Sequence, residues 1–175
     1  KDIEATVNQV FNDVAKNGDK AIAQYTAKFD GVALDDNIVS RAEVDEASKA
    51  VSEDLKKAIQ LAKSNIDNFH SAQKTKRVFV ETMTGVECWQ EKRPIQKVGL
   101  YIPGGTAPLF STVLMLAVPA KIAGVKEIVL CSPPNKEGKI HPAILFAAKV
   151  SGVTKVFKLG GVQAIGAMAY GCGSV

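Results

Sequence analysis

The second half of the chain alternates between short apolar runs and helix-forming segments, and this alternation constrains the fold more than any other feature. From Lys97 onward we predict three strand–helix pairs, with strands at Val98–Ile102, Glu127–Cys131 and Lys155–Leu159 and helices at Ser111–Ala123, at Pro142–Val150 and opening near Gln163. The predicted strands are continuously apolar, which is typical of parallel strands covered on both faces. Because crossovers between parallel strands are right-handed, the pattern predicts an α/β fold with an incomplete Rossmann-like parallel sheet, half of a doubly wound one.

Two glycine pairs stand directly after predicted strands and mark the first candidate for a binding site. Pro103-Gly104-Gly105 follows the first strand, and Gly160-Gly161 follows the third. Glycine permits tight turns and lets a ligand approach the backbone, and ligands of open α/β sheets bind at the carboxyl edge where such turns meet. Neither turn carries the Gly-x-Gly-x-x-Gly or Gly-Lys-Ser/Thr fingerprint, so plain strand-to-helix connections remain the alternative.

In the first 97 residues the apolar residues are spaced differently from those of the strand–helix pairs. Residues 1–73 have the apolar spacing of amphipathic helices, and residues 77–93 alternate about a turn at Thr84-Gly85 as a β-hairpin does. We therefore predict two regions. Residues 1–97 form a helical region plus a β-hairpin, and residues 98–175 form a partial Rossmann-like α/β domain.

Local signals predict where several helices begin, break and bury their side chains. Asp19 is a candidate N-cap, Ser40 forms a capping-box pattern with Glu43, and Ser52 precedes a helix expected over 55–69. The buried face of that helix is predicted to consist of its regularly spaced apolar residues: Leu55, Ile59, Leu61 or Ala62, Ile66 and Phe69. Pro119 is expected to kink or divide the helix over 111–123.

Composition narrows the classes of function. The net charge of +4 is spread along the chain, and its densest basic cluster, Lys74-Thr75-Lys76-Arg77, is short, which favours a solvated face over a nucleic-acid surface. No apolar run approaches the length of a membrane span. Three widely spaced cysteines favour a reducing, cytoplasmic setting over a disulfide framework. Because the sequence stops without the further strand that a doubly wound sheet needs, we expect it to be part of a longer polypeptide.

Few side chains can be assembled into a reactive site from the sequence. His70 and His141 stand apart from other ligand-type residues, which predicts neither a metal site nor a histidine base; both are interpreted as helix-end residues. Ser111 and Thr112, at a predicted helix N-terminus, can meet a polar or anionic ligand, although Ser111 can equally be an ordinary N-cap. Tyr101 can place its ring over a planar ligand or belong to the core.

Four runs of residues resemble the histidinol dehydrogenase family. They are GDKAIAQYTAKFDG (Gly18–Gly31), GLYIPGGTAPLFSTVLMLAVPAKIAG (Gly99–Gly124), EIVLCSPP (Glu127–Pro134) and VFKLGGVQAIGAMAYG (Val156–Gly171). The resemblance spans essentially the whole chain in order and corresponds to the N-terminal part of such an enzyme. It implies an aldehyde-dehydrogenase-like sheet and a homodimer that uses NAD and zinc. That enzyme oxidises L-histidinol through histidinal to L-histidine, the last step of histidine biosynthesis.

The resemblance also implies roles for individual residues. Tyr101 and Gln163 match residues that contact NAD, Phe29 and Pro103 match residues near the nucleotide, and Ser111 matches a residue near the substrate. The family binds NAD unlike a standard Rossmann protein, so the first glycine pair is not expected to cradle the pyrophosphate. Its zinc ligands, its Glu-His acid/base pair and its Gly-Pro-Gly-Asn segment have no counterpart in this sequence. No catalytic or metal-binding residue is therefore predicted here, and the chain alone is expected to be inactive.

Three other interpretations remain open at this point. One is a paralogous NAD-dependent dehydrogenase of another small polar alcohol, such as sulfopropanediol. Another is a non-catalytic, truncated module that folds and dimerises through its helical arm. The third, a nucleic-acid binder, needs a basic stripe that is not evident in the sequence. The expected partners are a small-molecule substrate and a second copy of the chain, with no nucleic acid and no membrane.

Overall fold

A parallel sheet stands at the centre of the computed structural model, which describes residues 2–34, 36–105, 107–172 and 175. Its strands are β3 (Lys97–Tyr101), β4 (Glu127–Ser132) and β5 (Lys155–Lys158), in the order β3-β4-β5. The register aligns Tyr101 with Cys131, and Cys131 with Phe157. All three strands therefore end at the same edge, which confirms the predicted parallel arrangement.

A short extended segment, residues 37–39, pairs with β5 and widens this sheet by one short strand. Ile38 forms an antiparallel bridge with Phe157. The amide of Val39 donates to the carbonyl of Val156 at 2.9 Å, and the amide of Lys158 donates to the carbonyl of Asn37 at 2.7 Å. The sequence analysis did not predict this segment, because three residues are too few to show a strand period.

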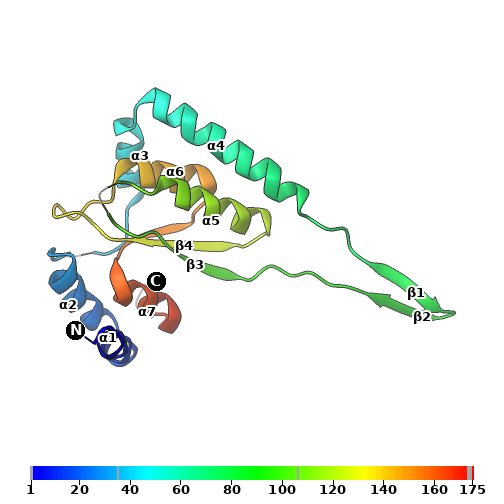
Figure 1. Cartoon of the computed structure of the whole chain (residues 1–175), viewed down its shortest axis with the longest axis horizontal. Helices are drawn as coiled ribbons and strands as arrows, with labels where there is room; N and C mark the ends of the chain where they lie inside the picture. The colour runs from blue at the N-terminus through cyan, green and yellow to red at the C-terminus, as the bar shows by residue number, and fades with distance from the viewer. Residues whose placement is uncertain (1, 35, 106, 173–174) are drawn as a thin grey trace.

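Helices cover both faces of the sheet (Figure 1). One face carries α3 (Arg41–Ala50), α4 (Glu53–Ala72), α5 (Phe110–Ile122) and α6 (Pro142–Ser151), and the other carries α1 (Ile3–Asn17), α2 (Asp19–Phe29) and α7 (Gly161–Tyr170). Alternate residues of β4 serve the two layers: Leu130 belongs to the cluster with α5 and α6, whereas Val129 and Cys131 belong to the cluster with α1, α2 and α7. The predicted α/β fold, with its N-terminal helical region and incomplete sheet, is confirmed.

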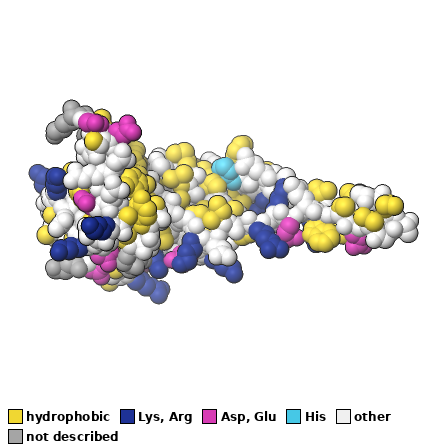
Figure 2. Space-filling view, turned by 90° about the horizontal axis from the view of Figure 1, so that it is seen from below, with side chains coloured by type: hydrophobic (Ala, Val, Ile, Leu, Met, Phe, Trp, Pro, Cys, Tyr) yellow, Lys and Arg dark blue, Asp and Glu magenta, His cyan; other side chains and the backbone are white. Residues whose placement is uncertain are grey.

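The β-hairpin projects from this body as an arm (Figure 1). Its strands, β1 (Phe79–Met83) and β2 (Val86–Trp89), pair in antiparallel fashion about the predicted turn, where Gly85 has φ of 82°. Every residue of both strands is exposed, including Phe79 and Trp89. Figure 2 shows apolar side chains distributed along the arm. The boundary between regions 1–97 and 98–175 stays a prediction.

The helix starts follow the sequence signals with one exception. Ser40 and Glu43 form a complete capping box, and the hydroxyl of Ser52 accepts from the amide of Leu55. Asp19 is not a cap, contrary to prediction; it is the first residue of α2, and Gly18 is the N-cap. Gly18, with φ of 52°, is both the C-cap of α1 and the N-cap of α2, so it is the single residue between the two helices.

Two predictions about helix interiors are wrong in part. On α4, Ile59 is buried and Leu55, Ala62 and Ile66 pack against the core as predicted, so Ala62 rather than Leu61 is the buried alternative. Phe69 is 65% exposed, contrary to prediction, since the far end of this long helix runs past α5 towards the hairpin (Figure 1). Pro119 does not divide α5, because the helix continues for another turn to Ile122. The helix therefore tolerates the missing backbone N–H of the proline. Within the described residues, no helix combines the length and apolar character needed to cross a membrane.

Candidate functional site

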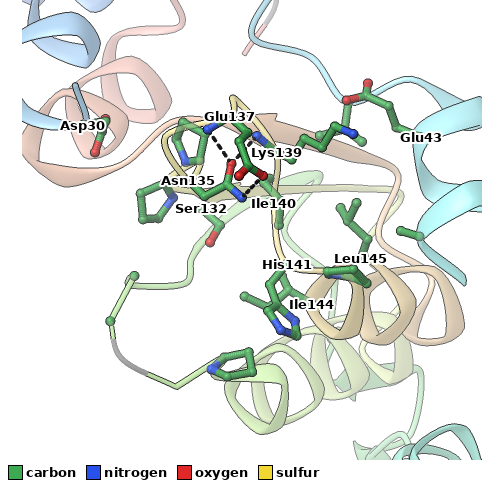
Figure 3. Close-up of a pocket in the computed structure, with 18 of the residues that line it drawn as sticks. Asp30, Glu43, Ser132, Asn135, Glu137, Lys139, Ile140, His141, Ile144 and Leu145 are labelled. Atoms are coloured by element: carbon green, nitrogen blue, oxygen red, sulfur yellow. Dashed lines mark hydrogen bonds between the residues drawn. The ribbon is translucent and has the colours of Figure 1, made fainter. Parts of the chain in front are cut away.

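A cavity of about 750 Å³ opens at the carboxyl edge of the sheet (Figure 3). The end of α2, the β3–α5 and β4–α6 loops and the exposed side of α3 line it, and among its residues are Phe29, Asp30, Pro103 and Gly104. Its volume lies within the range of small-molecule and cofactor pockets. The edge marked by the first glycine pair is therefore hollowed, although Thr106 of that loop lies outside the described residues. Gly160 and Gly161 of the second pair, like Tyr101 and Gln163, are not among the lining residues.

The two glycine pairs converge on one proline. A Cβ on Gly104 would stand 2.6 Å from Cγ of Pro133, and a Cβ on Gly160 would stand 2.5 Å from Cβ of the same residue. Pro133 follows β4, the central strand, so the turns after β3 and β5 press on it from its two sides. Close packing, rather than backbone freedom, explains the glycine at these two positions.

Tyr101 and Gln163, the two residues that the resemblance matched to NAD contacts, meet at Gly161. The amide of Gly161 donates to the hydroxyl of Tyr101 at 3.0 Å. Oε1 of Gln163 lies 2.8 Å from where a Cβ on Gly161 would stand, in space that a glycine with φ of 58° leaves open. The phenolic hydrogen of Tyr101 remains available, because the oxygen acts as acceptor towards Gly161.

The path of α7 brings these two residues together. After β5 the chain passes to the other face of the sheet, and α7 packs back against β3, where Met168 fills the space that a side chain at Gly99 would need. The start of α7 therefore lies beside the end of β3, although β4 separates β3 from β5 in the sheet. Gly99 makes this crossing possible, because any larger residue would displace Met168.

The Gln163 amide is fully buried and only half satisfied. Its Nε2 donates to Oδ2 of Asp30 at 3.3 Å, whereas Oε1 has no hydrogen-bond partner among the described residues. Asp30 is the residue after α2 and reaches Gln163 across 133 positions of sequence. Burial raises the pKa of the Asp30 carboxyl. The sequence analysis missed Asp30, because an Asp-Gly pair after a helix gives no signal beyond a helix end.

The remaining predicted site residues lie at different depths. Phe29 is 47% exposed and lines the cavity, with its ring stacked on Tyr25 at 5.4 Å between centroids. Pro103 is exposed and also lines the cavity. Ser111 is exposed, is not among the lining residues, and is the second residue of α5. Leu109 is the N-cap of that helix, so the alternative of Ser111 as an N-cap is wrong.

The wall opposite Asp30 is also polar (Figure 3). Glu43 forms an ion pair with Lys158 at 2.6 Å, and although burial raises the pKa of Glu43, hydrogen bonds from Lys158 and Ser40 outweigh it and hold the pKa below its ordinary value. His141 caps α6 as predicted, with Nδ1 accepting from the amide of Ala143, which leaves Nε2 to carry the proton of the neutral ring. The carbonyl oxygen of the Asn135 side chain accepts from the amides of Glu137 and Lys139 and orders the β4–α6 loop.

No metal centre can be assembled from the described part of the chain. Groups of three or more His, Cys, Asp or Glu side chains in ligating positions are absent from these residues. His70 bonds Gln73 at the end of α4, and His141 is engaged as a cap. The described residues therefore do not provide a zinc site.

Comparison with known proteins gives one consistent result. The family model described as histidinol dehydrogenase matches residues 1–175. Histidinol dehydrogenase of Bacteroides fragilis (strain ATCC 25285) is 61% identical over 170 residues, which are 97% of this chain and 40% of the relative, and that of Pasteurella multocida (strain Pm70) is 54% identical over 173 residues, which are 99% of this chain and 40% of the relative. The crystal structure of histidinol dehydrogenase from Elizabethkingia anophelis matches with a TM-score of 0.95 and 50% identity, covering 100% of this chain and 40% of that one. The chain thus spans about 40% of the length of the relatives it matches.

Proposed function

Because the chain belongs to the histidinol dehydrogenase family, we propose that it forms the nucleotide-binding part of an enzyme that oxidises L-histidinol through histidinal to L-histidine. This enzyme uses NAD as the oxidant and zinc as a Lewis acid, and it acts as a cytoplasmic homodimer. The relatives and the solved structure that carry this name cover the chain almost completely. The same protein would perform the last step of histidine biosynthesis.

The meeting of Tyr101 and Gln163 at Gly161 is the observation that supports this proposal best. The two residues lie on different elements, yet Tyr101 accepts from the amide of Gly161 and Oε1 of Gln163 lies in the space where a side chain at Gly161 would stand. The unpartnered Oε1 of Gln163 fits a ligand that brings a hydrogen-bond donor, because a buried acceptor without a partner is costly. The residues present therefore fit a nucleotide.

Four of the predicted site residues would each make a different contact with NAD. The exposed ring of Phe29 and the ring of Pro103 form apolar walls for a planar group. The Tyr101 hydroxyl donates its free hydrogen, and Oε1 of Gln163 accepts one. NAD, when bound, would supply the hydride acceptor, and these side chains would hold and orient the nucleotide. In this proposal Ser111, at the start of α5, contacts the substrate rather than the nucleotide.

The acid/base and zinc chemistry belongs to polypeptide outside these residues in this proposal. The 175-residue chain should therefore give no NADH with L-histidinol, whereas the full-length protein should release two NADH per histidinol consumed. Absorbance of NADH and chromatography of the imidazole product would measure both. Zinc-dependent NADH formation by the 175-residue chain would contradict the division of labour.

The same assay separates histidinol from other small polar alcohols. The full-length protein is expected to give a kcat/KM for L-histidinol that exceeds that for sulfopropanediol by at least about a hundredfold, since a site built to pair a substrate's polar groups rejects analogues that leave them unpaired. Equal or reversed values would assign the chain to a paralogous activity. Sedimentation of the full-length protein would test the proposed dimer.

A further inference from the structure

The Gln163 side chain is held in one orientation by Asp30, a residue that the sequence analysis did not predict. Amide groups can present either their oxygen or their nitrogen to a partner, and the partner decides which. Asp30 in its charged form offers only acceptors, so the end of Gln163 that faces it is the Nε2 donor, at 3.3 Å. Turning the amide over would place oxygen against oxygen in a buried place, where such a contact is strongly unfavourable.

This anchoring determines what remains at the other end of the amide. With Nε2 directed at Asp30, Oε1 lies under the turn at Gly161 and has no partner among the described residues. Two buried hydroxyls, those of Thr26 and Ser151, also have no partner in the described part of the chain. A hydroxyl can rotate towards a nearby carbonyl, whereas an anchored amide oxygen cannot. The missing donor for Gln163 must therefore come from outside these residues.

The surroundings of Asp30 fit a dedicated role. Its carboxylate lies at the margin of the cavity, on the side opposite Glu43 (Figure 3). Its Oδ1 lies 2.9 Å from where a Cβ on Gly160 would stand, so the glycine admits the carboxylate to this position. Asp30 makes no ion pair among the described residues, and its burial is therefore not repaid by a cation. A partly buried carboxylate is retained here at a cost in free energy.

We infer that Asp30 is a positioning residue for the nucleotide: it fixes the Gln163 amide so that Oε1 accepts a hydrogen bond from a hydroxyl or amide N–H of NAD. This inference rests on the proposed function and adds to it a residue and a polarity. Gln163 touches the ligand, and Asp30 acts through Gln163. The geometry requires a donor on the ligand at this point, not an acceptor.

A double-mutant cycle in the full-length protein tests the coupling. Asp30→Asn keeps the shape of the side chain but accepts or donates, so both orientations of Gln163 become satisfied and Oε1 is no longer held. The Kd for NAD, measured by titration calorimetry, should rise about tenfold or more. In a Gln163→Ala background the same change should raise the Kd less than about twofold. Asp36→Asn is the matched control and should leave the Kd unchanged. Asp36 is exposed and lies outside the cavity, and an asparagine in its place can still accept the hydrogen bond from the amide of Ile38.

An exchange of the pair tests the polarity. Gln163→Glu alone opposes two carboxylates and should weaken NAD binding most. When Asp30→Asn is added, the new asparagine amide donates to one oxygen of the carboxylate at position 163, and the other oxygen stays free to accept from the ligand. The double variant should therefore bind NAD better than Gln163→Glu by about tenfold. Circular dichroism of each variant verifies that it is folded, and a variant that is unfolded is replaced by Asp30→Ala in the same cycle.

The outcomes separate this inference from the proposed function. If the wild-type full-length protein does not bind NAD, the proposed function is overturned, and the inference fails with it. If NAD binds and Asp30→Asn leaves the Kd unchanged, or raises it equally with and without Gln163, the inference alone is overturned, and Asp30 is then a structural residue of the α2 end. Coupling between the two positions, with recovery in the exchanged pair, supports it.

Discussion

The turn between β5 and α7 is packed too tightly to admit a side chain at residue 160, so Gly160→Ala is expected to destabilise the chain. Its φ of −113° and ψ of 179° are open to any residue, and backbone strain is not involved. The added Cβ would stand 2.5 Å from Cβ and 3.2 Å from Cα of Pro133, and 2.9 Å from Oδ1 of Asp30. Favourable carbon–carbon contacts are about 3.5–4.0 Å, and a proline ring cannot turn aside. One of the two loops must move.

The size of the effect follows from that overlap. Extra methyl groups in a packed site cost about 1–3 kcal/mol, and an overlap of roughly 1 Å against a rigid neighbour places Gly160→Ala in the upper part of this range, at about 2–3 kcal/mol. For a chain of this size, the midpoint of thermal unfolding should fall by about 5–10 °C. Circular dichroism of the 175-residue chain during heating measures it.

Gly105→Ala is the matched control for this prediction. Gly105 belongs to the other glycine pair, its φ is not in the left-handed region, and no described atom lies within 4 Å of its Cβ position. Its unfolding midpoint should stay within about 2 °C of the wild type. Equal midpoints for the two variants would refute the reasoning that Gly160 is required for packing against Pro133.

Three further predictions concern other parts of the molecule. Tyr101→Phe removes the acceptor of the Gly161 amide and should raise the Kd of the full-length protein for NAD about fivefold. Tyr25→Phe, the control, removes only the hydrogen bond to Asp13 on α1 and should leave that Kd unchanged in the same calorimetric titration. Lys158 helps to hold the folded-state pKa of Glu43 below its ordinary value of 4.5. The pair therefore stabilises the fold above pH 4.5, and this stabilisation is lost as the pH falls through the lower folded-state pKa. Urea unfolding should show that Lys158→Met destabilises the chain at neutral pH and that the difference from the wild type shrinks on acidification. Cys131 is buried, and burial raises its pKa to about 12, so a thiol reagent near neutral pH should label the exposed Cys88 first and Cys131 only after unfolding, as mass spectrometry of the peptides would show.

The layered fold could be predicted because its strands and helices carry strong periods. The three apolar runs became β3, β4 and β5 with ends within one residue of the prediction, and the hairpin and the Ser40 capping box follow local residue types. Such signals depend on neighbours in sequence. The exposed end of α4 shows their limit: the spacing of Phe69 marks an apolar stripe, but only tertiary structure determines that nothing in the described chain covers it.

The position of the cavity could also be predicted, whereas its inner contacts could not. Parallel strands must end at one edge, so two glycine turns indicate where a ligand site lies. The contact between Asp30 and Gln163 depends instead on α2 lying beside α7, and neither helix carries a sequence feature that selects the other. The resemblance supplied Gln163 from a motif, but only the packed structure reveals which residue holds its amide.

The glycine pairs combine two explanations that the sequence presented as alternatives. Gly104 and Gly160 are small because Pro133 occupies the space where a side chain would stand, which is the property of a tight connection rather than of a phosphate cradle. Gly161, with positive φ, instead makes room for the Gln163 oxygen and donates to Tyr101. The packing requirement and the binding role are thus parts of one arrangement, because the compact turns bring Asp30, Gln163 and Tyr101 to the same place. A larger residue at 160 should therefore weaken nucleotide binding as well as stability, since its methyl group would push the Asp30 carboxylate away from the amide that it holds.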